Sequence, residues 1–467
     1  MNYHIYQDKN KKFEIIVTDV LSKAGGTAVV YNVQGTNDFV LKLYKDKKYA
    51  LKSEAKLKQF IKGFPSAELD SMTDLPIKVH QLAWPKNIVY EKNKPVGFLM
   101  PKISFKDTVQ LNRIFSIKNR KSERITEDIT WRIAVARNLA DVYNTLHNAG
   151  YYVVDTKPAN IRTYKMVPGV CLLDCDGFKL KNSPFEGDMI TPDYIAPESI
   201  GKPPAQLGRE QDIFALSVLI FQLLNNGIHP YSGILNKNDT IPIQERIKKS
   251  AYAYGKVQSR VQKPSPASVH HLFPTKLLDM FSRIFEKGDR PEANEWVSIL
   301  DELKKPSALS NCNKVGHRGF KKGCPTCAFE KILKDNKAPQ TNKNNNAKSA
   351  AYVSSSSGLG PWGSGTNIPP QPPKNQSGNS SLKFIGVVAL FLIFGLFLYN
   401  NSQENNYASN NSSNTSQTNN TTSYCNQNPR QCNNSELCKK ATLGDKWEVR
   451  DHFRAYVSLA KQKGLTC

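Results

Sequence analysis

The chain has 467 residues, with 64 Lys and Arg against 40 Asp and Glu, and a net charge of +24. Its length leaves room for two or three domains, and a hydrophobic fraction of 39% supplies a sizeable core. Near residue 304 the composition changes to Asn-, Ser- and Pro-rich sequence with one apolar block. A single soluble domain and a disulfide-rich secreted mini-protein are therefore both excluded.

Residues 1–125 show short strand patterns separated by turn signals, and the chain then becomes helical. Strands are predicted at 13–20, 29–33, 39–44 and 96–100, with one helix around 47–62. Further on, apolar residues at i, i+4, i+7, i+8 and i+11 predict one face of a helix: Val135, Leu139, Val142, Tyr143 and Leu146. Residues 213–224 are apolar nearly all round, which is typical of a helix buried in a large domain.

Phosphoryl transfer needs a flexible cover over a triphosphate, a cation on its oxygens, ligands for Mg²⁺ and a carboxylate facing the acceptor hydroxyl. Gly25 and Gly26 lie between two predicted strands and are candidates for the cover, although a plain hairpin turn fits them equally well. Lys42, on an otherwise apolar strand, is the candidate cation. Glu54, on the following helix, could hold Lys42 by an ion pair, and a surface position fits Glu54 nearly as well.

The strongest segment, residues 146–161, reads LHNAGYYVVDTKPANI. It resembles the catalytic loop of eukaryotic-like protein kinases, in which H-R-D-x-K-P-x-N follows a helix that ends L-H-x-x-G. The resemblance implies that Asp155 accepts the proton of the acceptor hydroxyl and that Lys157 steadies the transferred phosphoryl group. It also implies that Asn160 ligates Mg²⁺.

A second acidic segment follows an apolar strand at 170–173. Its residues, Asp174-Cys175-Asp176-Gly177, stand where the kinase family has D-F-G. By this resemblance Asp174 is a Mg²⁺ ligand, and Asp176 is the alternative if the register shifts by two residues. A turn cap is the plain alternative for such an acidic pair.

Three further segments match the family in order: TPDYIAPE at 191–198, DIFAL at 212–216, and DRP at 289–291, whose Arg290 would pair with the A-P-E glutamate. The resemblance covers about residues 13–303. It implies an α+β, bilobal protein-kinase-like domain at 1–303, with a β-rich N-lobe and a helical C-lobe.

The adenine base is expected to bind at residues 99–103, where Pro101 offers its carbonyl and Ile103 its backbone N–H. Val153 and Val154 replace the His-Arg of the family's catalytic loop. The missing arginine normally receives an activation-loop phosphate, so this chain should not depend on that switch.

Residues 304–334 carry a soft-ligand cluster on a basic segment. Four such groups lie within sixteen residues, as Zn²⁺ requires for a closed tetrahedral site: Cys312, His317, Cys324 and Cys327. We predict a structural zinc knuckle, with a reduced, unliganded loop as the alternative. With LAWP at 82–85, the cluster resembles a bacterial kinase-like family that has an A-W-P segment and a zinc-binding tail. Members of that family are often associated with metal-dependent protein phosphatases and von Willebrand A-type partners.

Residues 384–399 are sixteen residues without a charge and predict one transmembrane helix, with a buried core helix as the alternative. Residues 304–383 carry thirteen Lys and Arg against two acidic residues. The positive-inside rule therefore places the kinase domain in the cytoplasm and the C-terminus outside. Four tail cysteines agree, because an even set favours two disulfides in an oxidising space: Cys425, Cys432, Cys438 and Cys467.

The remaining segments complete the predicted layout. Polar, Asn- and Ser-rich composition predicts a disordered linker at 335–383 and a spacer at 400–424. Residues 425–467 should form a small disulfide-stapled α module, extracytoplasmic and suited to sensing or anchoring.

These features together predict a single-pass protein kinase of the cell membrane that uses ATP with Mg²⁺ or Mn²⁺ and phosphorylates Ser or Thr of protein substrates. A nucleotide-binding pseudokinase scaffold is the alternative. A nucleic-acid-binding membrane protein is a lesser one, because the excess charge lies beside the predicted membrane segment, where anionic lipid accounts for it.

Overall fold

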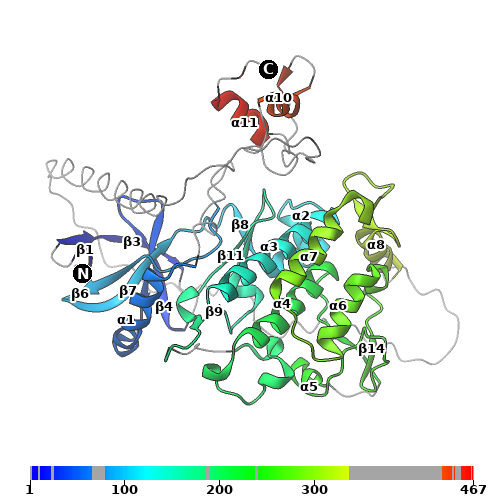
Figure 1. The fold of residues 1–467 in the computed structure, drawn as a ribbon, viewed down its shortest axis with the longest axis horizontal. Helices are drawn as coiled ribbons and strands as arrows, with labels where there is room; N and C mark the ends of the chain where they lie inside the picture. The colour runs from blue at the N-terminus through cyan, green and yellow to red at the C-terminus, as the bar shows by residue number, and fades with distance from the viewer. Residues whose placement is uncertain are drawn as a thin grey trace, which may run out of the picture. The chain divides into compact units, whose positions relative to one another are not determined.

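The computed structural model describes residues 3–8, 11–22, 26–65, 79–185, 190–236, 240–335, 434–443, 446–447, 454–463 and 465. Between residues 3 and 335 a β-rich lobe is followed by a helical lobe, as predicted (Figure 1).

The first lobe is built on a seven-stranded antiparallel sheet with the strand order β2-β1-β6-β7-β5-β4-β3. The strands are β1 (Tyr3–Asp8), β2 (Lys11–Ile15), β3 (Val17–Ser22), β4 (Ala28–Val33), β5 (Phe39–Tyr44), β6 (Asn87–Glu91) and β7 (Lys94–Pro101). The predicted strand at 13–20 is divided between β2 and β3. The sequence patterns did not predict β1 or β6, which pair with each other and so extend the sheet.

One helix, α1 (Lys47–Lys62), packs on this sheet at the predicted residues. It begins where the Asp46 side chain accepts a hydrogen bond from the backbone N–H of Lys48 at 2.8 Å, which satisfies one of the unpaired donors of the first turn. Ala50 and Leu57 of α1 are buried in one cluster with residues of the sheet. The helix therefore has a fixed apolar face toward β5 and β7.

The second lobe is mainly helical. Its helices are α2 (Ile117–Ser122), α3 (Ile129–Asn148), α4 (Arg209–Leu224), α5 (Ile243–Lys248), α6 (Thr275–Phe285) and α7 (Ala293–Lys304). Its short strands are β8 (Thr108–Gln110), β9 (Tyr151–Tyr152), β10 (Ile161–Tyr164), β11 (Val170–Leu172), β12 (Lys179–Leu180), β13 (Gly233–Leu235) and β14 (Gln262–Pro264). Every residue of α4 from Gln211 to Leu224 is buried, which confirms the predicted core helix. The predicted apolar face of α3 is buried as well.

Residues 305–335 form a compact extension of the helical lobe. The extension consists of the hairpin β15 (Leu309–Asn311) and β16 (Arg318–Phe320), followed by α8 (Pro325–Asp335). Phe320 is fully buried in the same hydrophobic cluster as the lobe's helices, with its ring centroid 5.8 Å from that of Phe273. This part of the predicted basic segment thus shares the core of the lobe.

Near the C-terminus the structure describes α10 (Asn434–Ala441), β17 (Thr442–Leu443), β18 (Lys446–Trp447) and α11 (Arg454–Gln462). The two helices bury Leu437, Ala441 and Ala460 between them. Cys438 is disulfide-bonded. The other three tail cysteines, the spacer at 400–424 and the predicted linker beyond Asp335 lie outside the described residues.

The predicted location as a single-pass membrane protein, with a cytoplasmic kinase domain and an outer C-terminus, is corrected by the structure. Among the described residues, none of the helices combines the length and apolar character that crossing a bilayer requires. At 20 residues α3 has the length, but it carries Arg132, Arg137 and Asp141, whereas the apolar α4 has only 16 residues. The block at 384–399 on which the prediction rested lies outside the described residues.

Candidate active site and metal centre

A group of polar and charged side chains joins the two lobes, and we call it the lysine cluster: Lys42, Tyr44, Asp174 and Asp176. Lys42 Nζ donates hydrogen bonds to Asp174 Oδ1 at 2.9 Å and to Asp176 Oδ1 at 2.7 Å. Tyr44, on the same face of β5 as Lys42, donates to Asp176 Oδ2 at 2.9 Å. One lysine thus meets two carboxylates that follow β11.

Burial and charge fix the ionisation of this cluster. Burial acts to lower the pKa of Lys42, but the charges and hydrogen bonds of Asp176 and Asp174 outweigh it, so the pKa is raised. Burial likewise acts to raise the pKa of Asp176, yet Lys42 and the Tyr44 hydroxyl lower it below its ordinary value. The Lys42–Asp176 pair is therefore ionised at neutral pH.

The hairpin of β10 and β11 brings Asn160 beside Asp174. In its register Ile161 pairs with Leu172, and Leu173 N donates to Asn160 O at 2.8 Å. Asn160 therefore lies opposite the residue that precedes Asp174. The Asp174 side chain is 61% exposed, and only its Oδ1 is engaged among the described residues. A carboxylate oxygen and an amide oxygen at one end of a hairpin are ligands that Mg²⁺ accepts, so these residues fit the predicted ion.

A second group, the aspartate cluster, consists of Asp155, Lys157, Asn160 and Thr191. Asp155 Oδ2 accepts hydrogen bonds from Lys157 Nζ at 2.6 Å and from Asn160 Nδ2 at 3.3 Å. Its other oxygen, Oδ1, accepts one from Thr191 Oγ1 at 2.7 Å. The Asp155 side chain is 21% exposed. The structure thus brings the two predicted catalytic residues and one predicted Mg²⁺ ligand together around one carboxylate.

Hydrogen bonds to Asp212 of α4 hold the loop that carries Asp155. The fully buried Asp212 carboxylate accepts hydrogen bonds from the backbone N–H groups of Val153 and Val154, each at 2.7 Å. Val154 has φ +63°, a conformation that β-branched residues rarely adopt. Asp212 therefore stabilises a strained backbone directly before Asp155, the predicted base.

The predicted pair at the end of the activation segment is confirmed. Arg290 Nε and NH2 donate to Glu198 Oε1 and Oε2 at 2.6 and 2.7 Å, a bidentate geometry.

The predicted partnership between Glu54 and Lys42 is corrected by the structure. Glu54 Oε1 accepts a hydrogen bond from Tyr90 Oη at 3.1 Å and is paired with Lys58 Nζ at 2.7 Å. Lys42 is instead paired with the two aspartates that follow β11, Asp174 at 2.9 Å and Asp176 at 2.7 Å.

The remaining predicted nucleotide residues lie next to the ends of strands β4 and β7. Gly26 precedes β4, and a Cβ there would meet no atom within 4 Å; Gly25 lies outside the described residues. Pro101 ends β7, and Lys102 N donates to Asp38 O at 2.7 Å. Within the described part of the chain, the backbone N–H of Ile103 has no hydrogen-bond acceptor, as adenine binding would require.

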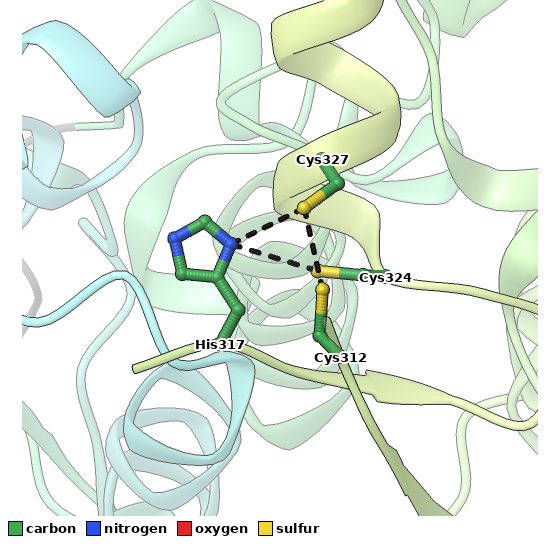
Figure 2. A group of neighbouring side chains, drawn as sticks. All are labelled: Cys312, His317, Cys324 and Cys327. Carbon is green, nitrogen blue, oxygen red and sulfur yellow. Dashed lines mark hydrogen bonds between the residues drawn. The ribbon is translucent and has the colours of Figure 1, made fainter. Parts of the chain in front are cut away.

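The four predicted zinc ligands converge on one point (Figure 2). The ligand atoms of Cys312, His317, Cys324 and Cys327 all lie within 4.8 Å of one another. His317 Nδ1 is 3.3 Å and Cys312 Sγ is 3.4 Å from Cys327 Sγ. Burial, followed by the neighbouring thiols Cys312 and Cys324, raises the pKa of Cys327 to about 12. Three thiols and one imidazole at these separations fit a tetrahedral Zn²⁺ and leave no open position.

Residues next to the ligands tie this centre to the start of α3. Thr326 Oγ1 donates to Glu127 O at 3.1 Å and accepts from the fully buried Arg132 at 3.3 Å. Arg318 Nε donates to Asp128 Oδ2, the cap of α3, at 2.8 Å. The Cys/His centre is thus attached to the helix that leads into the catalytic loop.

Sequence reasoning missed the contacts of Tyr44 and of Thr191. Strand alternation places Tyr44 on the face of Lys42, which is a usable signal, but it does not name Asp176 as the acceptor. Thr191 stood out as part of TPDYIAPE, and nothing in the sequence indicated its bond to Asp155.

Comparisons with known proteins find relatives that are named as protein kinases. Two proteins named protein kinase YegI, from Escherichia coli O157:H7 and strain K12, are 29% identical over 326 residues, which cover 66% of this chain and 48% and 47% of theirs. The chain thus spans about half the length of these curated relatives. Serine/threonine-protein kinase 1 of Orgyia pseudotsugata multicapsid polyhedrosis virus is 34% identical over 100 residues, 21% of this chain and 35% of that protein.

Among solved structures, the Cydia pomonella granulovirus kinase PK-1 aligns with a TM-score of 0.42 and 17% identity, over 62% of this chain and 93% of that one. No protein-family model matches the chain. The sequence relatives support a protein-kinase-like family.

Proposed function

We propose that this chain is a protein kinase that transfers the γ-phosphoryl group of ATP to serine or threonine hydroxyls of protein substrates. The observation that carries the proposal is the aspartate cluster. Asp155 is partly exposed, and Lys157, Asn160 and Thr191 fix its orientation. A carboxylate held in this way can accept the proton of an incoming hydroxyl while a lysine beside it faces the phosphoryl oxygens.

The nucleotide and metal assignments belong to the same proposal. Lys42 would contact the phosphates, and the Pro101 carbonyl and Ile103 N–H would contact adenine. Asp174 and Asn160 would hold Mg²⁺ or Mn²⁺, which neutralises charge on the phosphate oxygens. Cys312, His317, Cys324 and Cys327 would hold a structural Zn²⁺ that takes no part in the transfer.

The alcohol specificity is supported by Thr191. Its hydroxyl lies 2.7 Å from Asp155 Oδ1, so the activation segment closes directly on the proposed base. A threonine hydroxyl of the chain itself thus reaches the proposed base, which supports a short alcohol side chain as the acceptor. A metal-dependent protein phosphatase and a von Willebrand A-type protein are proposed partners, on the family resemblance alone.

Radiolabelled ATP tests the proposal. The purified whole chain is incubated with Mg²⁺ or Mn²⁺, with itself and a generic basic protein as acceptors, beside Asp155→Asn and Lys42→Ala. We expect label on protein with the wild type and a loss of label with both variants. ATP binding without transfer to either acceptor would contradict the proposal and point to a nucleotide-binding pseudokinase.

A further inference from the structure

The two carboxylates that pair with Lys42 differ in burial and in how many of their oxygens accept a hydrogen bond. The Asp176 side chain is 6% exposed, and both of its oxygens are engaged, one by Lys42 and one by Tyr44. The Asp174 side chain is 61% exposed and, within the described ranges of the chain, is engaged through one oxygen. Asp176 therefore belongs to the interior around the lysine, whereas Asp174 is accessible to a solvent-borne ion.

The helix that follows the lysine strand supplies no carboxylate to it. In protein kinases generally, a glutamate from this helix pairs with the lysine, and movement of the helix controls that pair. Here Glu54, the acidic residue of α1, accepts hydrogen bonds from Tyr90 and Lys58. The C-terminal end of α1 is also fixed, since Trp84 Nε1 donates to Phe60 O at 2.9 Å and their rings stack at 5.2 Å.

We propose that Asp176 is the residue that positions Lys42 for the phosphates, in the place that the sequence pattern assigned to Glu54. This inference rests on the proposed function and narrows it. Asp176 is then a positioning residue and not a Mg²⁺ ligand, and the metal is left to Asp174 and Asn160.

The carboxylates that hold Lys42 come from the turn after β11. Lys42 and Tyr44 come from one strand, and each donates a hydrogen bond to a different oxygen of Asp176. Asp176 lies in the short turn Cys175–Gly177, directly after β11, whose own partner is the strand that begins after Asn160. The lysine is therefore fixed by the same hairpin that presents the metal ligands. Among the described residues, α1 contacts this turn, and the charge of its Lys56 also acts on Asp176. The carboxylates that hold Lys42 nevertheless come from Asp174 and Asp176 and not from α1.

A double-mutant cycle on ATP binding tests the inference with the whole chain. The variants are Asp176→Asn, Lys42→Met and the double variant, with dissociation constants for Mg²⁺-ATP from calorimetry. Because a hydrogen bond to a charged group is involved, we expect Asp176→Asn to weaken binding about 10- to 100-fold. In the Lys42→Met background the same change should cost less than about threefold, since Asp176 acts through the lysine. An equal loss in both backgrounds would overturn the inference.

Two further readouts separate positioning from the alternatives. The Mg²⁺ concentration that gives half-maximal ATP binding should rise for Asp174→Asn and stay within about twofold of wild type for Asp176→Asn. A matching rise in both variants would make Asp176 a metal ligand and overturn the assignment. Glu54→Gln serves as the comparison on α1 and should lose less affinity than Asp176→Asn; a loss as large would return the role to Glu54.

Tyr44→Phe tests the inference without changing a charge, which covers the case in which the charge variants misfold. It keeps both charges and removes only the hydroxyl that orients Asp176, so we expect binding about two- to fivefold weaker with an unchanged thermal unfolding curve. Unchanged binding in this variant would count against the inference. The double-mutant cycle measures ATP binding and does not require phosphate transfer. A wild type that binds ATP without transferring phosphate would therefore contradict the proposed function, and the cycle could still be measured.

Discussion

The aspartate cluster and the Cys/His centre both lie in or on the helical lobe, and they differ in how their side chains are used. Asp155 is partly exposed, and its partners come from the catalytic loop and from the activation segment. The Cys/His ligands come from sixteen consecutive residues whose neighbours are tied to the start of α3. The first arrangement suits chemistry on an incoming group, whereas the second suits a structural attachment. Variants in the aspartate cluster should therefore change the rate of phosphate transfer, whereas variants in the Cys/His centre should change the free energy of unfolding.

The largest expected effect is on rate alone. Asp155→Asn removes the proposed base and keeps the size of the side chain, so phosphate transfer should fall by about 10²- to 10⁴-fold. The dissociation constant for Mg²⁺-ATP and the urea unfolding curve should match those of the wild type. A comparable loss of folding stability would break the distinction between the two regions.

The Cys/His centre should show the opposite behaviour. Cys327→Ser removes one ligand of four, and we expect the free energy of unfolding to fall by on the order of 3–5 kcal/mol. Circular dichroism in urea measures the loss, and removal of metal from the wild type by a chelator should reproduce it. The matched control is Cys171→Ser, a buried cysteine outside the centre, which should keep the wild-type response to the chelator, whereas Cys327→Ser should lose most of it. Stability that is independent of both ligand and chelator would contradict a structural metal.

A buried histidine should link pH to the stability of the helical lobe. Burial lowers the pKa of His229 from 6.5 to about 3. Its Nδ1 accepts from Tyr231 N at 3.1 Å, so Nε2 donates to Asp193 O, 3.0 Å away, and the ring must stay neutral. The depressed pKa gives stability that is present above pH 6.5 and is lost progressively as the pH falls toward 3.

We expect this loss to reach about 2 kcal/mol between pH 7 and 4.5. Urea unfolding at several pH values measures it, and His229→Gln should flatten that part of the profile. His270, whose pKa is lowered to about 4 by burial and by His271, contributes to the same slope, so His270→Gln is measured beside His229→Gln as the second source of the loss. A slope that His229→Gln does not alter would assign the effect elsewhere.

The smallest expected effect is at Thr191. Thr191→Val removes the hydroxyl that holds Asp155 Oδ1 and keeps the shape of the side chain. Loss of one hydrogen bond to a charged group should slow transfer by about tenfold. Thr191→Ser restores the hydroxyl and should recover most of the rate. Equal rates in the Val and Ser variants would show that the contact does not orient the carboxylate.

Sequence patterns predicted best what depends on nearby residues. The spacing of Cys312, His317, Cys324 and Cys327 already brings four ligands within reach, and the structure gathers them. The catalytic-loop spacing likewise brings Lys157 and Asn160 to Asp155.

Partners far apart in the chain were harder to predict. Three carboxylates were available to Lys42, those of Glu54, Asp174 and Asp176, and only packing decides between them. Strands β1 and β6 were missed, and they pair with each other although more than eighty residues separate them.

Intact-mass spectrometry of the whole chain after incubation with Mg²⁺-ATP tests the kinase assignment most directly. The account predicts added phosphoryl groups on wild-type protein that map to serine or threonine, and their absence from Asp155→Asn. Wild type that binds ATP and gains no phosphate, on itself or on a protein acceptor, would contradict it, as would an Asp155→Asn variant that is phosphorylated at the wild-type rate.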